Sequence, residues 1–235
     1  SDFAAAKDLF VREIDRAPFH HEFHYWLAVA YAGLGDWERA RKELETALET
    51  IPVPDLAANE MSSALRKRAA ATALLAQLDF MEGHTDRGHQ RFVEGENMLA
   101  PKRESMAMLD PVDLVHLHSI AARTYANAGM RDRALDHVHK ARENLRRALG
   151  HGPSVPVWES MFQQWSDLDA LQVKLLLADD APASRESALS VAESAKGRLL
   201  AWLARMRDRN AGYDALEPGR TDEAIARLRA WAGER

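Results

Sequence analysis

Histidine is the residue type that offers the most chemistry in this chain of 235 residues, because it occurs ten times whereas cysteine does not occur. His20 and His24 are spaced i, i+4 and could share one face of a helix. The segment HHEFH nevertheless differs from the HExxH motif of zinc proteases, because His21 and His24 are only three residues apart. We therefore interpret this group as ordinary helix histidines.

Two further histidine pairs stand at i, i+2, namely His116 with His118 and His137 with His139. Side chains two residues apart point in different directions from a helix. We interpret all four as structural or surface residues. The sequence accordingly predicts neither a metal site nor a cofactor.

Motifs of nucleophilic or phosphate chemistry are also absent from the sequence. There is no cysteine and no GxSxG elbow, and the serines fall in polar turns or at helix starts. The segments GLGD and GHGP lack the lysine and the strand–helix context of a phosphate-binding loop. We predict that the chain is not an enzyme and holds no catalytic residue.

Composition and charge narrow the classes of partner. A hydrophobic content of 46% with 29% charged residues is typical of a folded protein. A net charge of −5 argues against nucleic acid, which favours basic surfaces. No apolar run approaches the roughly 20 residues that a transmembrane helix needs. We expect no nucleic acid and no membrane partner, and the lack of cysteine fits a cytoplasmic location.

Residues 21–52 form the clearest structural unit, and their pattern predicts two amphipathic helices. Apolar residues at three- and four-residue spacing mark the buried face of the first helix, which is Trp26, Leu27, Ala30 and Tyr31. Gly33 and Gly35 are expected to end that helix, and Asp36 to cap the next. The buried stripe of the second helix is predicted to be Ala40, Leu44, Ala47 and Leu48.

This unit resembles a tetratricopeptide repeat (TPR), a helix–turn–helix of 34 residues. With Tyr31 at the eleventh repeat position, the matching residues are Leu27, Ala28, Gly35, Asp36, Trp37, Ala40, Leu44, Ala47 and Pro52. The first tryptophan position departs, since it holds His24. The resemblance implies an all-α fold, a right-handed α-α solenoid of about four to five helix hairpins, some with lengthened helices.

The same register recurs along the chain, which we interpret as one domain over residues 1–235. The same offset of 94 residues separates Tyr125 from Tyr31 and Gly129 from Gly35 (125 − 31 and 129 − 35). The predicted units are a half repeat at 2–18, repeats at 21–52, 57–100 (degenerate and long) and 112–149, a long terminal hairpin at 157–207 and a short helix at 219–232. Because the chain opens on a second repeat helix, we expect a fragment of a longer protein; a lone capping helix is the alternative.

The C-terminal third carries a further pattern, A-x-x-x-A-E-x-x-K-x-R-x-L. It is formed by Ala188, Ala192, Glu193, Lys196, Arg198, Leu199 and Leu200, with Gly197 where alanine is more usual. This resembles the last repeat of TPR arrays that precede a caspase-like (CHAT) peptidase domain in bacterial proteins. The resemblance implies an effector whose catalytic His and Cys would lie beyond Arg235.

A TPR array binds partners in the groove lined by the first helix of each hairpin. The groove-facing repeat positions predict a partner-binding set of Glu22, Tyr25, Val29, Gln77, His116, Ser119, Arg123 and Asn127. The Lys/Asn clamp that some TPR proteins use for a terminal carboxylate is not reproduced, so Arg123 is the best single anchor. The expected ligand is a protein or peptide, and the oligomeric state stays open.

Three functions are compatible with such an array. The favoured one is a non-enzymatic interaction domain that receives a protein or peptide and positions or regulates an attached effector, with a caspase-like peptidase as one candidate. A second is the ligand- or peptide-sensing domain of a bacterial transcription regulator. The third is a stand-alone scaffold.

Overall fold

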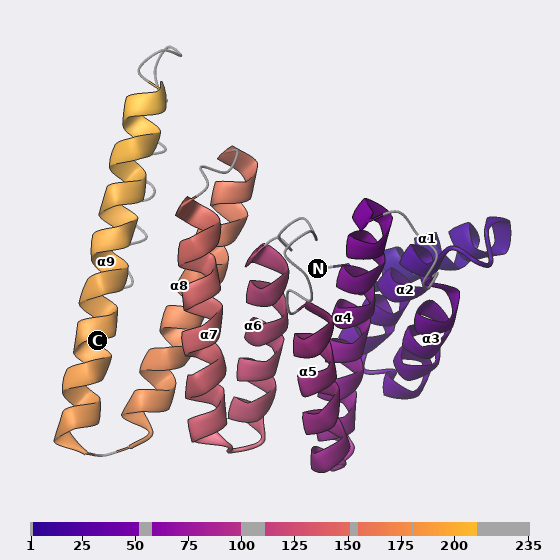
Figure 1. Ribbon diagram of the computed structural model, residues 1–235, viewed down its shortest axis with the longest axis horizontal. Coiled ribbons are helices and arrows are strands. Elements are labelled where there is room, and N and C mark those ends of the chain that lie inside the picture. Colours follow the sequence, from indigo (N-terminus) through magenta and orange to yellow (C-terminus); the bar gives the residue numbers. More distant parts are fainter. Residues whose placement is uncertain (1, 52–57, 100–110, 151–154, 180, 211–235) are drawn as a thin grey trace. The chain divides into compact units, whose positions relative to one another are not determined.

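The computed structural model describes residues 2–51, 58–99, 111–150, 155–179 and 181–210. These residues form nine α-helices and no strand (Figure 1). The helices are α1 (Phe3–Arg16), α2 (His21–Gly33), α3 (Trp37–Thr50), α4 (Ala58–Met81), α5 (Thr85–Leu99), α6 (Pro111–Asn127), α7 (Arg131–Gly150), α8 (Val155–Leu177) and α9 (Pro182–Asn210). The short helix predicted at 219–232 lies outside the described residues.

The chain divides into two compact units, residues 1–175 and residues 176–235. In the second unit, α9 begins with Pro182, whose missing N–H costs nothing at a first helical position. Asp179 stands just before this helix and accepts a hydrogen bond from the Ser184 hydroxyl at 2.8 Å. No helix in the described parts of the chain is long and apolar enough to cross a membrane.

Three hairpins of the first unit share one turn. Gly35, Gly83 and Gly129 have φ of 80°, 82° and 72°, a backbone that favours glycine because a side chain would clash there. The residue after each glycine donates its backbone N–H to the carbonyl five residues earlier, at 2.8–2.9 Å. The three donor–acceptor pairs are Asp36 to Tyr31, His84 to Asp79 and Met130 to Tyr125. This is the Schellman pattern of helix ends. The predicted register of Gly35 and Gly129 is confirmed, and Gly83 has the same place in the second full hairpin.

Helix starts follow the same 34-residue spacing at the N-terminal end. The Asp2 carboxylate accepts a hydrogen bond from the Ala5 N–H at 3.0 Å, and Asp36 accepts one from Arg39 at 3.2 Å. Each satisfies an N–H that a helix start leaves without an intrahelical partner. The half repeat predicted at 2–18 is therefore a helix, α1, built like α3.

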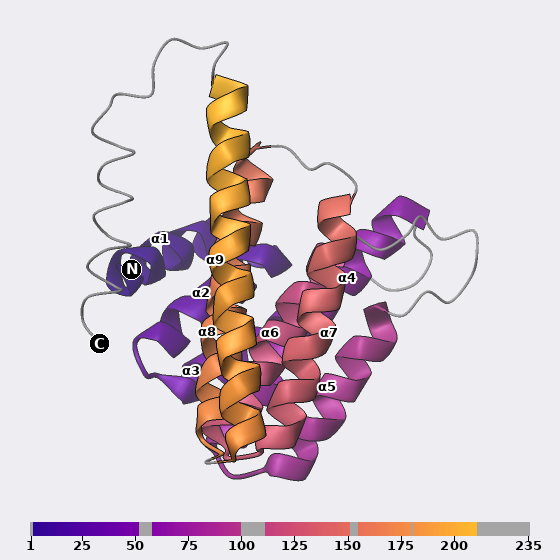
Figure 2. The same cartoon turned by 90° about the vertical axis from the view of Figure 1, so that its left-hand side faces the viewer.

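Within residues 1–175, sequential helices pair into hairpins, and each hairpin packs on the next. α1 packs on α2, and the pairs α2–α3, α4–α5 and α6–α7 are antiparallel neighbours; α6 and α7 lie side by side in both views (Figure 1 and Figure 2). α3 contacts α4, and α6 contacts both α4 and α5. This order of contacts is that of a TPR-like helical solenoid, as the sequence predicts.

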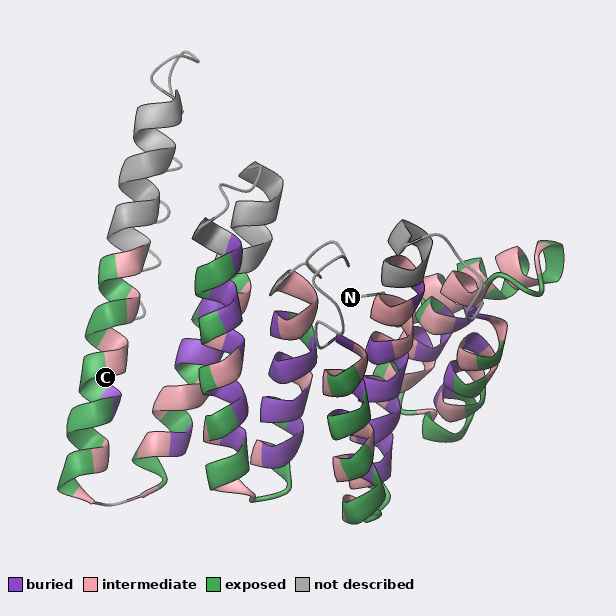
Figure 3. Ribbon diagram, in the orientation of Figure 1, coloured by how far each residue is buried: buried purple, intermediate pink, exposed green. Residues whose placement is uncertain are grey.

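Buried positions follow the small and apolar residues of the repeat, shown in purple in Figure 3. One cluster joins α2, α3 and α4 around Ala28, Leu44 and Leu75. Another joins α4 to α8 around Phe92 and Tyr125, both at most 1% exposed. Because each hairpin buries its apolar face only against its neighbours, the stack is the unit of stability.

A buried carboxylate links the first two full hairpins. Asp79 on α4 is fully buried, at the repeat position where Tyr31 and Tyr125 stand elsewhere. Its oxygens accept hydrogen bonds at 2.8 Å from Arg41 on α3 and from Arg87 and Arg91 on α5. Burial is the largest single influence and would raise the pKa of Asp79, but the hydrogen bonds from Arg87 and Arg41 and the charges of Arg91 and Arg41 together lower it. Asp79, which departs from the repeat pattern, is thus a buried carboxylate paired with arginines of the neighbouring helices.

Replacing Asp79 by asparagine removes the negative charge that Arg41, Arg87 and Arg91 share. We predict that Asp79→Asn lowers the free energy of unfolding by about 3–5 kcal/mol, the usual cost of breaking a buried ion pair from one side. Urea denaturation followed by circular dichroism measures it. Glu45→Gln, at an exposed position of α3, is the control and is expected to change it by less than about 0.5 kcal/mol. An equal effect of both variants would contradict the assignment.

The contribution of Asp79 also depends on pH. Because its pKa is lowered in the folded state, the stabilisation is complete above the ordinary carboxyl value of 3.8 and is lost as the pH falls below that value. The difference in unfolding free energy between wild type and Asp79→Asn should therefore be constant from pH 7 to pH 5 and shrink at lower pH. A difference that grows on acidification would be incompatible with a paired carboxylate.

Candidate functional site

A cavity of about 410 Å³ opens beside α2, the first helix of the first full hairpin. α3, α4 and the start of α6 complete its walls. Its lining residues are His21, Glu22, Tyr25, Trp26, Ala47, Ile51, Ser63, Arg66, Lys67, Ala70, Ala71 and Asp113. All of them belong to the first unit of the chain.

The apolar wall of this cavity is aromatic. Tyr25 is half-buried, whereas Trp26 is 50% exposed, and their rings meet edge to face with centroids 5.1 Å apart. The prediction that Trp26 joins the buried face of its helix is wrong, whereas Leu27 and Ala30 are buried as predicted, together with His24 and Ala28. An exposed tryptophan at the mouth of a cavity offers a large apolar surface to a ligand.

Charged side chains of α4 line the same cavity. Lys67 Nζ lies 2.5 Å from Glu22 Oε1 and 3.1 Å from His21 Nε2. The hydrogen bond from Lys67 lowers the pKa of Glu22, whereas burial and then the Lys67 charge lower the pKa of His21. Arg66 makes a looser ion pair with Asp113, at 3.7 Å. These pairs leave the α4 cations partly exposed to the cavity.

A second cavity, of about 190 Å³, adjoins the first. Both are lined by Arg66, Ala70 and Asp113, and the second adds residues of α6 and α8, among them His116 and Gln164. We call the two together the groove. The groove lies along α2, α4 and α6, which are the first helices of successive hairpins, as the TPR resemblance implies.

The predicted partner-binding residues divide between the groove and other places. Glu22, Tyr25 and His116 line it. Five others line neither cavity, namely Val29, Gln77, Ser119, Arg123 and Asn127. The groove residues that the predicted partner-binding set lacked include Trp26, Arg66, Lys67 and Asp113.

Two of these five residues already have protein partners. Ser119 is buried, and its hydroxyl donates to the Val115 carbonyl of its own helix at 2.6 Å. Arg123, expected to be the main anchor, is exposed and donates to Asp167 on α8 at 3.3 Å. A ligand carboxylate would have to compete with Asp167 for this arginine.

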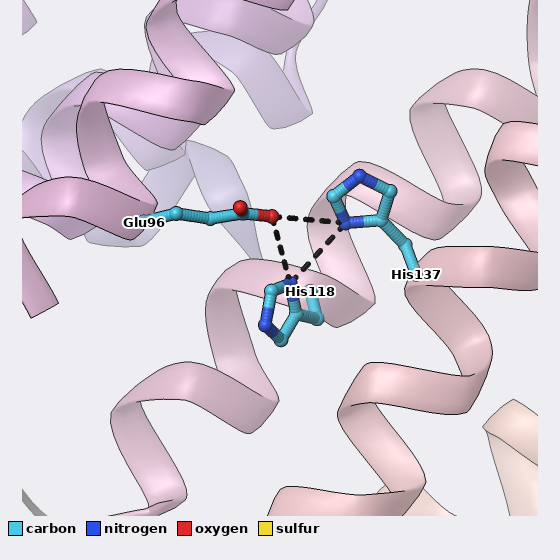
Figure 4. A group of neighbouring side chains, drawn as sticks. All are labelled: Glu96, His118 and His137. Carbon is cyan, nitrogen blue, oxygen red and sulfur yellow. Dashed lines mark hydrogen bonds and ion pairs between the residues drawn. The ribbon is translucent and has the colours of Figure 1, made fainter. Parts of the chain in front are cut away.

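A separate polar cluster lies between the second and third hairpins (Figure 4). Glu96 comes from α5, His118 from α6 and His137 from α7. The Nδ1 atoms of His118 and His137 are 3.2 Å apart. Glu96 Oε1 lies 3.5 Å from the Nδ1 atom of His118 and 3.7 Å from the Nδ1 atom of His137. Both imidazoles are buried, with 5% and 6% exposure. The structure thus joins two histidines that the sequence analysis treated as unrelated.

The repeat register could have revealed the pairing of these histidines. His24 and Glu43 of the first full hairpin are the equivalents of His118 and His137, since 118 − 24 and 137 − 43 both equal 94. His24 Nδ1 lies 2.6 Å from Glu43 Oε2, so this position pairs side chains across the hairpin. A comparison of each histidine with the equivalent residue of the first full hairpin, instead of by i, i+2 spacing, therefore predicts the contact between His118 and His137.

A second group, Asp79, Glu82 and His84, also has three ligand-type atoms close together. Its acidic members are already held by arginines. Asp79 is bound by the three arginines described above, and Arg41 Nη2 lies 2.9 Å from Glu82 Oε2. This group is therefore explained as part of the ion-pair network between hairpins.

Comparison with known families supports the repeat assignment. The family model of the tetratricopeptide repeat matches residues 21–52, which comprise α2, α3 and the end of the hairpin. No curated protein matched the chain. The chain is therefore similar to TPR proteins over its first full hairpin, and TPR repeats generally mediate protein–protein interaction.

The histidine cluster gives a prediction on protonation. Burial is the main cause that lowers the pKa of His118 to about 3 and that of His137 to about 4. Both rings should therefore stay neutral from pH 8 to pH 5, which ¹⁵N-detected imidazole shifts would measure in the protein free of metal. A midpoint above pH 6 for either ring would contradict the burial seen in the structure.

Proposed function

We propose that this chain is a protein-interaction module that holds a peptide segment of a partner protein in the groove. The observation that carries the proposal is the half-exposed Trp26 beside Tyr25 at the mouth of a cavity of about 410 Å³. The TPR match at residues 21–52 supports the same class of function.

The lining of the groove defines the chemistry of the peptide. A large apolar side chain would pack on Trp26 and Tyr25 in a cavity that the small residues Ala47 and Ala71 also line, where it displaces water from apolar surface. A neighbouring carboxylate on the peptide would meet Arg66 and Lys67 of α4, which line the same cavity. The ligand class is thus an apolar anchor next to an acidic residue.

The internal ion pairs of the groove affect selectivity. Lys67 holds Glu22 and Arg66 faces Asp113, so a neutral peptide gains nothing from displacing these acids. A peptide that brings its own carboxylate replaces the displaced acid and leaves no cation without a partner. Charge complementarity of this kind supplies specificity more than affinity.

We also propose, from sequence alone, that the module positions an attached effector. The pattern of Ala188, Ala192, Glu193, Lys196 and Arg198 supports a caspase-like peptidase as the first candidate. Reading the gene on both sides of these residues tests the idea. A frame that encodes a strand-rich domain with a His and a Cys would support it, and a stop codon after Arg235 would exclude it.

The binding proposal is tested by selecting peptides from a random library on the immobilised chain and measuring affinities by fluorescence anisotropy. We predict that selected peptides carry an aromatic or large aliphatic residue next to Asp or Glu. Trp26→Ala should weaken binding about 30-fold or more, as expected of a central aromatic contact worth about 2 kcal/mol. Tyr25→Ala and Lys67→Ala should each weaken it less.

Trp37→Ala is the matched control, because Trp37 is 38% exposed but lies on α3 outside the groove. It should leave the affinity unchanged. Arg123→Glu tests whether the wider surface of α6 takes part in binding. Because Arg123 lines neither cavity, this variant should also leave the affinity unchanged. If folded Trp26→Ala and Tyr25→Ala proteins bind the selected peptides as wild type does, the groove is not the binding site.

A further inference from the structure

The cluster of Glu96, His118 and His137 has a donor set that transition metals prefer. Two imidazole nitrogens and one carboxylate oxygen are the ligand types of many protein zinc sites. The three ligand atoms come from three helices and converge on one point (Figure 4). Convergence of this kind requires the hairpins to be stacked, so the cluster does not exist in a single hairpin.

The separations of these atoms match the geometry of a bound ion. Zinc binds imidazole nitrogen at about 2.0–2.1 Å, so the ligand atoms of a tetrahedral site lie about 3.3–3.4 Å apart. The measured separations are 3.2, 3.5 and 3.7 Å. Side-chain shifts of a few tenths of an ångström would complete three corners of the tetrahedron.

Aromatic side chains pack around one of the two rings. The His137 ring packs against Tyr125 and Phe92, with centroids 5.2 and 6.3 Å away. Oriented ligand rings need less reorganisation on binding, which favours metal affinity. Glu96 is the more exposed member, with 29% of its side chain accessible, and gives an ion a route from solvent.

We propose that Glu96, His118 and His137 bind one divalent transition-metal ion, with zinc as the first candidate and a water at the fourth position. Lys140 Nζ lies 3.5 Å from Glu96 Oε1 and offsets its charge. The same ammonium also contacts Asp136 at 3.0 Å, so it keeps a partner when an ion takes over Glu96. The metal ion would therefore take the place of Lys140 in balancing the charge of Glu96.

A metal ion here would fasten the second hairpin to the third, since α5 supplies one ligand and the α6–α7 hairpin the other two. The equivalent position of the first full hairpin, His24 with Glu43, makes a closed pair in which His24 Nε2 also lies 2.9 Å from the Pro18 carbonyl. In the third hairpin, histidine replaces that glutamate, and Glu96 from the preceding hairpin supplies the carboxylate. Metal binding is thus specific to one interface of the stack.

The test is titration of chelator-treated protein with Zn²⁺ by calorimetry and with Co²⁺ by visible absorption. We expect one ion per chain, a tetrahedral Co²⁺ spectrum and a rise in melting temperature on adding Zn²⁺. His118→Gln, His137→Gln and Glu96→Gln should each lower the affinity more than about 100-fold, beyond the 10–100-fold usual for residues that only support a ligand. Circular dichroism checks that the variants are folded.

His139→Gln is the matched control, because His139 is exposed on the same helix as His137. It should bind Zn²⁺ as wild type does, and so should His24→Gln at the equivalent hairpin position. Absence of saturable binding of one Zn²⁺ or Co²⁺ ion per chain would overturn the proposal. Equal affinity in the three ligand variants and wild type would overturn it as well.

Discussion

One hydrogen-bonded turn sets the register on which the described stack depends. In three hairpins, a glycine with positive φ is followed by an N–H that donates to the carbonyl five residues earlier. Because the turns are alike, residues at equivalent positions relative to the turn make equivalent contacts across each hairpin. This places His24 opposite Glu43 and His118 opposite His137, each pair within 3.2 Å. Changes of residue type at fixed positions therefore give each hairpin a different chemistry.

Two kinds of surface follow from this arrangement. The first helices α2, α4 and α6 line the groove, whose larger cavity is lined by Trp26 and the α4 cations. The contacts between hairpins are closed by apolar clusters and by charged groups, with the Asp79 network on one interface and the Glu96 cluster on the next. The proposed metal site would thus act on the stacking of hairpins, and the groove on the partner. Helix α6 contributes both to the groove and to the Glu96 cluster. The rigidity of the contact between the second and third hairpins therefore bears on the shape of the groove.

Much of the fold could be predicted from sequence because its signals are local. Gly35, Gly83 and Gly129 mark turns by residue type alone, and Asp2 and Asp36 mark helix starts. The exposure of Trp26 could not be predicted, since periodicity does not say which of two adjacent apolar residues faces the next helix. The Asp79 network needed the positions of arginines on two other helices. Glu96 and His118 come from different hairpins, so their meeting depends on the stacking distance, which no spacing in the sequence reports.

The most direct test of the binding groove is chemical-shift mapping of the folded chain with a selected peptide. Six tryptophans give separate indole N–H signals, and those of Trp26 and Trp37 report on the groove and on an exposed site outside it. The structure predicts that the peptide shifts the Trp26 indole and the backbone amides of Tyr25, Arg66 and Lys67, while the Trp37 indole stays in place. Shifts confined to α3 or α5, with the Trp26 indole unmoved, would contradict binding in the groove.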